Sequence, residues 1–107
     1  MAKVTVYNKL VRDKIPQIIA HSGKSCATRI LGQDTYVEKL EEKLGEELAE
    51  YRQSGELEEL ADLLEVMEAL VAARGFQWKQ LTDIQHQKRE KRGGFDGRLL
   101  LVDVTEE

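Results

Sequence analysis

Residues 35–74 read TYVEKLEEKLGEELAEYRQSGELEELADLLEVMEALVAAR, and this stretch decides the fold. Apolar residues recur in it at a helical period, in two runs that a Ser54-Gly55 turn separates. The period predicts helices at about 36–53 and 57–74, and the short turn between them predicts that they run antiparallel. The fold class that follows is mainly α, built on an antiparallel helical hairpin.

Shorter elements flank this hairpin. Thr35 and Glu38 form an S/T-x-x-E capping box, so we expect the first long helix to begin at about residue 36. We also expect a short helix at about 16–21, a fourth helix at about 78–88, and short β segments toward the two ends, within 3–11, 27–31 and 98–104.

Composition limits the class of protein. The 107 residues predict a single domain over 1–107, and a charged fraction of 34% beside a hydrophobic fraction of 41% favours a folded domain over disorder. A net charge of −4 argues against a nucleic-acid partner. No apolar run is long enough to span a membrane, and the first residues lack a signal-peptide pattern. We therefore expect a cytoplasmic globular protein with no membrane partner.

Four carboxylates stand in unusual places on the helical wheel: Glu47, Glu50, Glu59 and Asp62. Glu47 falls on the edge of the apolar stripe of the first helix, whereas Glu46 falls toward the solvent side. Glu59 and Asp62 fall among the apolar residues of the second helix. Each pair is spaced i, i+3, so a helical hairpin would bring two pairs of carboxylates to face one another.

Carboxylates in an apolar setting need a partner, because an unpaired buried charge is costly. Bound metal is one partner, and hard oxygen ligands suit Mg²⁺, with Mn²⁺ as a substitute. Salt bridges between the helices, to Lys43, Arg52 or Arg74, are the other. The residues alone leave both alternatives open.

The same carboxylates carry a family resemblance. Residues 43–50 (KLGEELAE) and 59–64 (ELADLL) together give the pattern E-x-x-E…E-x-x-D on two consecutive helices. This pattern resembles the signature of the all-α nucleoside triphosphate pyrophosphatase superfamily, which includes MazG, the dimeric dUTPases and phosphoribosyl-ATP pyrophosphohydrolase. The ends agree, since residues 7–16 (YNKLVRDKIP) and 88–95 (KREKRGGF) are similar to those of a MazG-related branch of small house-cleaning pyrophosphatases.

The resemblance implies a reaction and a cofactor. Related enzymes hydrolyse a nucleoside triphosphate between the α and β phosphates, giving monophosphate and pyrophosphate. The resemblance implies that Mg²⁺ would be held by Glu47, Glu50, Glu59 and Asp62, with Glu47 or Glu50 as the general base. Phosphoribosyl-ATP hydrolysis is a second enzyme hypothesis. It is disfavoured because the eight residues 51–58 between Glu50 and Glu59 make a shorter connection than those enzymes generally have.

Two groups of basic residues are candidates for binding substrate phosphates. Lys9 and Arg12 would do so from the N-terminal stretch; alternatively, Arg12 pairs with an acidic helix face while Asp13 caps a helix. Lys91 and Arg92 precede Gly93-Gly94 and would clamp phosphate, or else favour a helix C-terminus as solvated cations.

The helix at 57–74 is apolar on two faces, and a chain of this size has few other elements to cover both. We therefore expect a homodimer or homotetramer that completes a four-helix-bundle-type assembly, as the resemblance also implies. A non-enzymatic helical dimerisation or regulatory module, its carboxylates held by salt bridges, is the alternative from a different functional class.

Overall fold

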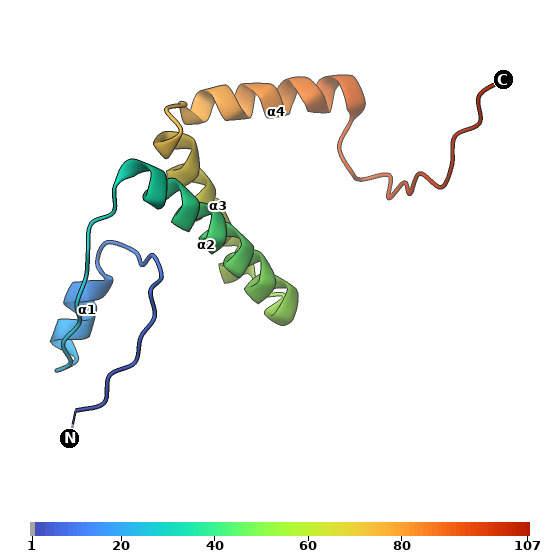
Figure 1. Cartoon of the computed structure of the whole chain (residues 1–107). Coiled ribbons are helices and arrows are strands. Elements are labelled where there is room, and N and C mark those ends of the chain that lie inside the picture. The colour runs from blue at the N-terminus through green and yellow to red at the C-terminus, as the bar shows by residue number, and fades with distance from the viewer. Residues whose placement is uncertain (1) are drawn as a thin grey trace. The chain divides into compact units, whose positions relative to one another are not determined.

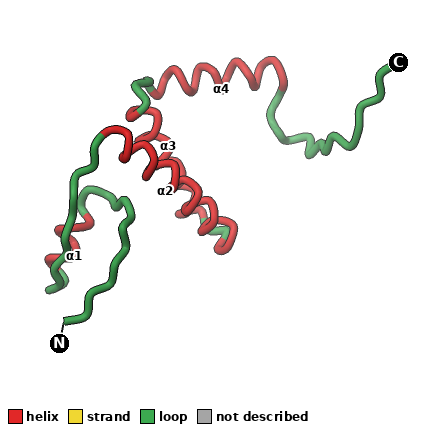
Figure 2. The backbone as a smooth tube through the Cα atoms, in the orientation of Figure 1, coloured by secondary structure: helices red, strands yellow, loops and turns green. Residues whose placement is uncertain are grey.

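The structure is a computed structural model that describes residues 2–107, and these residues form four helices joined by turns and extended chain (Figures 1 and 2). The helices are α1 (Ile15–His21), α2 (Gln33–Ser54), α3 (Leu57–Ala73) and α4 (Trp78–Arg92). The prediction of a mainly α protein is confirmed.

The helices α2 and α3 lie side by side and pack together (Figure 1). The chain reverses at Gly55, whose left-handed backbone (φ 69°) caps α2 and lets its N–H donate to the Tyr51 carbonyl at 2.7 Å. At the other end, the Gln33 side chain donates to the Ala73 carbonyl at 2.6 Å. The start of α2 thus meets the end of α3, which makes the hairpin antiparallel.

Two helix ends differ from the prediction. The first long helix begins at Gln33, not at residue 36, and its N-cap is Gly32 with no side-chain cap. The predicted capping box at Thr35 and Glu38 is therefore wrong. The hydrogen bond from the Gln33 side chain to α3 gives a physical reason for the earlier start. A tertiary contact can extend a helix beyond the point where a local capping pattern predicts that it begins. The helix α4 likewise continues to Arg92, past the predicted end near residue 88.

The short terminal β segments are not confirmed, since residues 2–107 contain no strand. A strand needs a hydrogen-bonded neighbour, and an isolated extended segment has none. The segments at 3–11, 27–31 and 98–104 have no regular secondary structure and are largely exposed; Val4 is 83% and Leu99 is 95% accessible to solvent.

The chain divides into two compact units, residues 1–76 and 77–107. The first contains α1 and the hairpin, whose interface buries Leu40 and Val66. The second contains α4 and the segment that follows it. The single domain predicted over 1–107 stays a prediction. None of the helices described is long and apolar enough to cross a membrane.

Candidate metal centre

Glu47 is the most unusual residue of the hairpin. It lies in the middle of α2, only 6% exposed, and is the one charged side chain buried in the described part of the chain. Its Oε2 atom is buried without a hydrogen-bond partner, while Oε1 lies 3.4 Å from the Lys43 Nζ atom one turn earlier. A buried oxygen with an unused acceptor position is costly, so its presence calls for an explanation.

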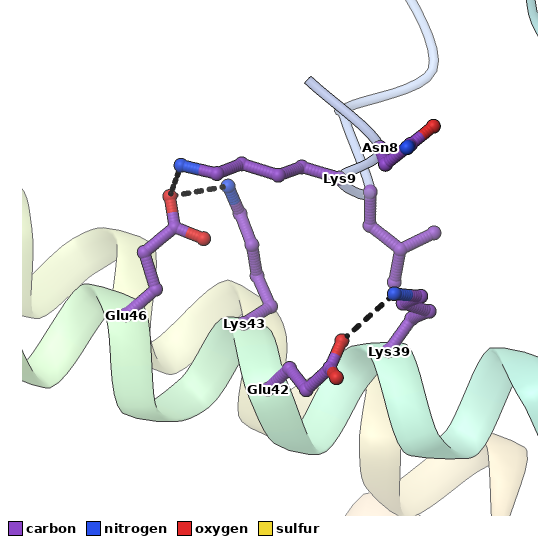
Figure 3. Close-up of a pocket in the computed structure, with 7 residues that line it drawn as sticks. Asn8, Lys9, Lys39, Glu42, Lys43 and Glu46 are labelled. Carbon is purple, nitrogen blue, oxygen red and sulfur yellow. Dashed lines mark hydrogen bonds and ion pairs between the residues drawn. The ribbon is translucent and has the colours of Figure 1, made fainter. Parts of the chain in front are cut away.

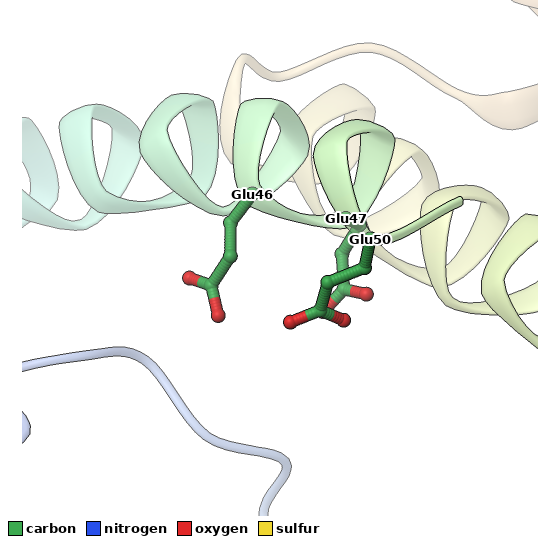
Figure 4. A group of neighbouring side chains, drawn as sticks. All are labelled: Glu46, Glu47 and Glu50. Carbon is green, nitrogen blue, oxygen red and sulfur yellow. The ribbon is translucent and has the colours of Figure 1, made fainter. Parts of the chain in front are cut away.

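Glu47 belongs to two groups of carboxylates. With Glu59 and Asp62 of α3 it forms one group, and with Glu46 and Glu50 of α2 it forms the other. Within each group, one oxygen from every member lies within 4.8 Å of the others. The three α2 side chains project from the same side of that helix (Figure 4). Glu47 is the shared member and stands where the two helices bring their acids together.

The electrostatics of the two groups favour a cationic partner. Burial raises the pKa of Glu47, and the neighbouring carboxylate of Glu50 raises it further, against the opposing charge of Lys43. Desolvation also raises the pKa of Glu59, together with the charges of Glu50 and Asp62. These carboxylates therefore hold protons more readily than isolated ones, as expected where like charges crowd.

Part of the charge is balanced by two lysines at Glu46. Lys9 Nζ donates to Glu46 Oε1 at 3.2 Å, and Lys43 Nζ approaches the same oxygen at 3.6 Å (Figure 3). They meet beside a hollow of about 30 Å³, lined also by Asn8, that is about the size of one water molecule. The chain bends into this contact at Asn8, which adopts a left-handed backbone (φ 49°) that asparagine tolerates better than most residues.

The N-terminal stretch also places a cation on α3. Arg12 Nη2 donates to Asp62 Oδ1 at 2.6 Å, and Arg12 Nη1 lies 3.9 Å from Glu65 Oε1. The alternative in which Arg12 pairs with an acidic helix face is thus seen. Asp13 does not cap α1, since the N-cap residue is Lys14 and no side chain bonds there.

A cleft of about 480 Å³ opens beside these groups and lies within the first compact unit. Arg12, Lys43, Glu47 and Asp62 contribute to its wall, and residues such as Tyr36, Leu40 and Val66 contribute apolar surface. Its volume falls in the range typical of small-molecule sites. The arrangement therefore combines hard oxygen donors, cations and apolar surface around one opening.

The structure brings the predicted carboxylates together but places one further glutamate among them. Glu47, Glu59 and Asp62 are brought together as expected, and Glu50 joins Glu47 through the second group. Glu46 was wrongly placed on the solvent side: its side chain is 27% exposed and belongs to that group. Its i, i+4 spacing from Glu50 was the available signal. Of the expected salt-bridge partners, Lys43 pairs along α2, while Arg52 and Arg74 make no ion pair within residues 2–107.

The second basic group lies in the other compact unit. Lys91 and Arg92 occupy the last turn of α4 and are exposed. Their predicted role in binding phosphate stays a prediction.

Comparisons with known proteins add a partial similarity. No family model matches the chain, and no solved structure matches it. A stretch of 44 residues, 41% of the chain, is 48% identical to a protein of Mycolicibacterium smegmatis (strain ATCC 700084 / mc(2)155) that is described as an uncharacterized protein. The match covers 45% of that protein, so the chain spans less than half the length of the relative. The inference of function therefore rests on the site and on the sequence pattern of its carboxylates.

Proposed function

We propose that this protein is a metal-dependent nucleoside triphosphate pyrophosphohydrolase, which cleaves the α–β phosphoanhydride to give a monophosphate and pyrophosphate. One observation carries the proposal: Glu47 is buried, its Oε2 is unpartnered, and it lies among carboxylates from two helices beside a cleft. The resemblance of residues 43–50 and 59–64 to the all-α pyrophosphatase signature supports the same reaction.

The donor set fits Mg²⁺, with Mn²⁺ as a substitute. The group at Glu47, Glu59 and Asp62, with Glu50 beside it, supplies only carboxylate oxygens, which these ions prefer. The unpartnered Oε2 of Glu47 has an acceptor position that a cation would fill. A divalent ion bound there would neutralise phosphate oxygens and lower the pKa of a water molecule.

The remaining side chains have distinct roles in this proposal. Glu50 is exposed, unlike Glu47, so it is the better placed of the two to accept a proton from the attacking water. Lys9 and Arg12 are cations at the carboxylates and would bind the phosphate chain. The same role is proposed for Lys91 and Arg92 of α4. The apolar side of the cleft would take the base. House-cleaning of noncanonical nucleotides in the cytoplasm is the role that the resemblance favours.

The proposed enzyme is a homodimer or homotetramer. One face of α3 packs on α2, but its other face leaves Leu57, Leu60, Leu64 and Met67 between 39% and 78% exposed. These residues follow the i, i+3, i+7 spacing of one helical stripe, and a second hairpin laid on it would complete a four-helix bundle.

The test is product analysis with the full chain. Canonical and damaged nucleoside triphosphates, and phosphoribosyl-ATP, are incubated with Mg²⁺ or Mn²⁺, and monophosphate, pyrophosphate and orthophosphate are quantified. Glu47→Gln and Asp62→Asn remove charge from the carboxylate groups, and Glu41→Gln removes an exposed charge elsewhere on α2 as a matched control. We expect pyrophosphate release by the wild type and the control, and its loss in both site variants.

Other products would assign another function. Cleavage of phosphoribosyl-ATP alone would favour that enzyme over a house-cleaning one. Orthophosphate without pyrophosphate would contradict the proposed bond cleavage. If no substrate is cleaved and both site variants are more stable than the wild type with or without metal, the helical dimerisation or regulatory module, with Arg12 and the lysines as structural ion pairs, becomes the better account.

A further inference from the structure

The N-terminal stretch reaches across 50 residues of sequence to place Arg12 on Asp62. The contact is short, 2.6 Å from Nη2 to Oδ1, and the second guanidinium nitrogen, Nη1, faces Glu65 at 3.9 Å. Arg12 and Asp62 line the same cleft as Glu47, whose buried Oε2 has no partner. A cation of the chain itself thus contacts one of the carboxylates of the proposed metal group.

Arginine and a divalent ion compete for that carboxylate. The guanidinium and a metal ion are both positive, so they repel each other at one carboxylate and share its negative charge. A divalent ion at Asp62 therefore weakens the contact of Arg12 with Oδ1 and favours its release. The pair is more than a third exposed on both sides, with side chains 57% and 38% accessible, so solvent screening keeps the contact weak enough to exchange.

After its release from Asp62, Arg12 can bind a phosphate group. A guanidinium binds phosphate through paired hydrogen bonds, with the same geometry that it uses for a carboxylate. A phosphate chain bound at the metal would lie in the cleft that Arg12 already lines. The side chain would exchange one anion for another without leaving the cleft.

We infer that Arg12 couples metal binding to phosphate binding, by holding Asp62 until a divalent ion takes that carboxylate and then pairing with the phosphate of the substrate. The inference rests on the proposed metal site and adds a regulatory role for the N-terminal stretch. Because such coupling is reciprocal, phosphate must tighten metal binding by the same factor by which metal tightens phosphate binding. The site would then favour the metal–nucleotide complex over either component alone.

The test measures Mn²⁺ binding to the full chain by electron paramagnetic resonance of the free ion, with and without inorganic phosphate. Protein-free samples correct for Mn²⁺ bound by phosphate in solution. The variants are Arg12→Gln, which removes the charge, and Arg12→Lys, which keeps it. The control is Lys24→Gln, an exposed cation that makes no ion pair in the described chain. Thermal melting of each variant in chelator confirms that it is folded.

Without phosphate, Arg12→Gln should bind Mn²⁺ about two- to fivefold more tightly than the wild type. This factor corresponds to the stabilisation by an exposed ion pair, which the metal ion must overcome in the wild type. Phosphate should tighten Mn²⁺ binding in the wild type by a clearly larger factor than in Arg12→Gln. Arg12→Lys should lie between them, and Lys24→Gln should match the wild type.

Each other outcome has a defined meaning. Equal Mn²⁺ affinity of the wild type and Arg12→Gln without phosphate would overturn the coupling and leave the metal site standing. An equal effect of phosphate on both proteins would also overturn the coupling. If neither protein binds Mn²⁺, with or without phosphate, the proposed metal site itself fails, and the coupling fails with it.

Discussion

Replacement of Glu47 by glutamine should stabilise the metal-free protein. Glutamine has nearly the same shape but no charge, so it removes the desolvation cost of a carboxylate that is 6% exposed and has one unpartnered oxygen. Its amide N–H group can also donate to the neighbouring Glu50 carboxylate, which a second carboxylate cannot do. Leaving a buried acceptor unsatisfied costs about 1–3 kcal/mol. Lys43, 3.4 Å from the other oxygen, returns about 0.5 kcal/mol as an i, i+4 pair. The net gain for Glu47→Gln is therefore about 1 kcal/mol.

This gain should depend on pH in a defined direction. Burial, and then Glu50, raise the pKa of Glu47 in the folded state above its ordinary value of 4.5. A carboxyl whose pKa is raised on folding binds more protons folded than unfolded, so its contribution to stability falls as pH rises from its ordinary value through its folded value. The advantage of Glu47→Gln should thus be small at about pH 4 and full at about pH 8.

The assay is thermal unfolding in chelator at matched protein concentrations. A gain of about 1 kcal/mol raises Tm by about 4–8 °C for a chain of this size. Glu41→Gln, the exposed control on the same helix, should leave Tm within about 2 °C of the wild type. With excess Mn²⁺ the wild type should melt at a higher temperature than Glu47→Gln. A metal at about 100 times its Kd adds about 2.7 kcal/mol to the stability of a protein that binds it, and only the wild type keeps the intact site. A Glu47→Gln protein that melts at or below the wild type in chelator at about pH 8 would refute the reasoning.

Three further predictions concern other parts of the chain. Gly55→Ala should destabilise the hairpin by about 1 kcal/mol in urea unfolding, because the backbone φ angle of Gly55 is 69°. Gly45→Ala, in the interior of α2 where an added Cβ meets nothing, should stabilise the hairpin by about 0.5–1 kcal/mol, and equal effects of the two variants would contradict the capping role of Gly55. Leu64→Glu, on the exposed stripe of α3, should shift the protein to monomers in light scattering, whereas Glu58→Gln should not; a monomeric wild type would remove the basis of the proposed assembly. Lys91→Gln with Arg92→Gln should raise KM for a nucleoside triphosphate about tenfold or more while kcat changes little, and an unchanged KM would leave both as solvated cations at the end of α4.

The hairpin could be predicted from sequence because its signals are local. Apolar residues at helical spacing, the Ser54-Gly55 turn and the positions of Glu47, Glu59 and Asp62 on the wheel all lie within residues 35–74. The helical period predicted that Glu47, Glu59 and Asp62 would face the partner helix, and the structure brings these three together.

Features that depend on distant contacts were harder to predict. The helix α2 begins at Gln33, earlier than predicted, and the Gln33 side chain donates to the Ala73 carbonyl at the far end of α3. No local sequence pattern encodes this contact. Glu46 is half-buried because Lys9 and the chain at Asn8 fold over it, and the wheel of an isolated helix cannot show that. The β-like segments failed for the same reason, since β composition does not supply a neighbouring strand.

The most direct test of the central claim is a titration of the wild-type protein with Mn²⁺, followed by electron paramagnetic resonance, in the presence of a nucleoside triphosphate with a methylene group between the α and β phosphates. This analogue occupies the site but resists the proposed cleavage. The account predicts protein-bound Mn²⁺ beyond that held by the analogue in solution, strongly reduced in Asp62→Asn and retained in Glu41→Gln. Protein-bound Mn²⁺ that is absent from the wild type, or unchanged in Asp62→Asn, would contradict a metal centre at these carboxylates.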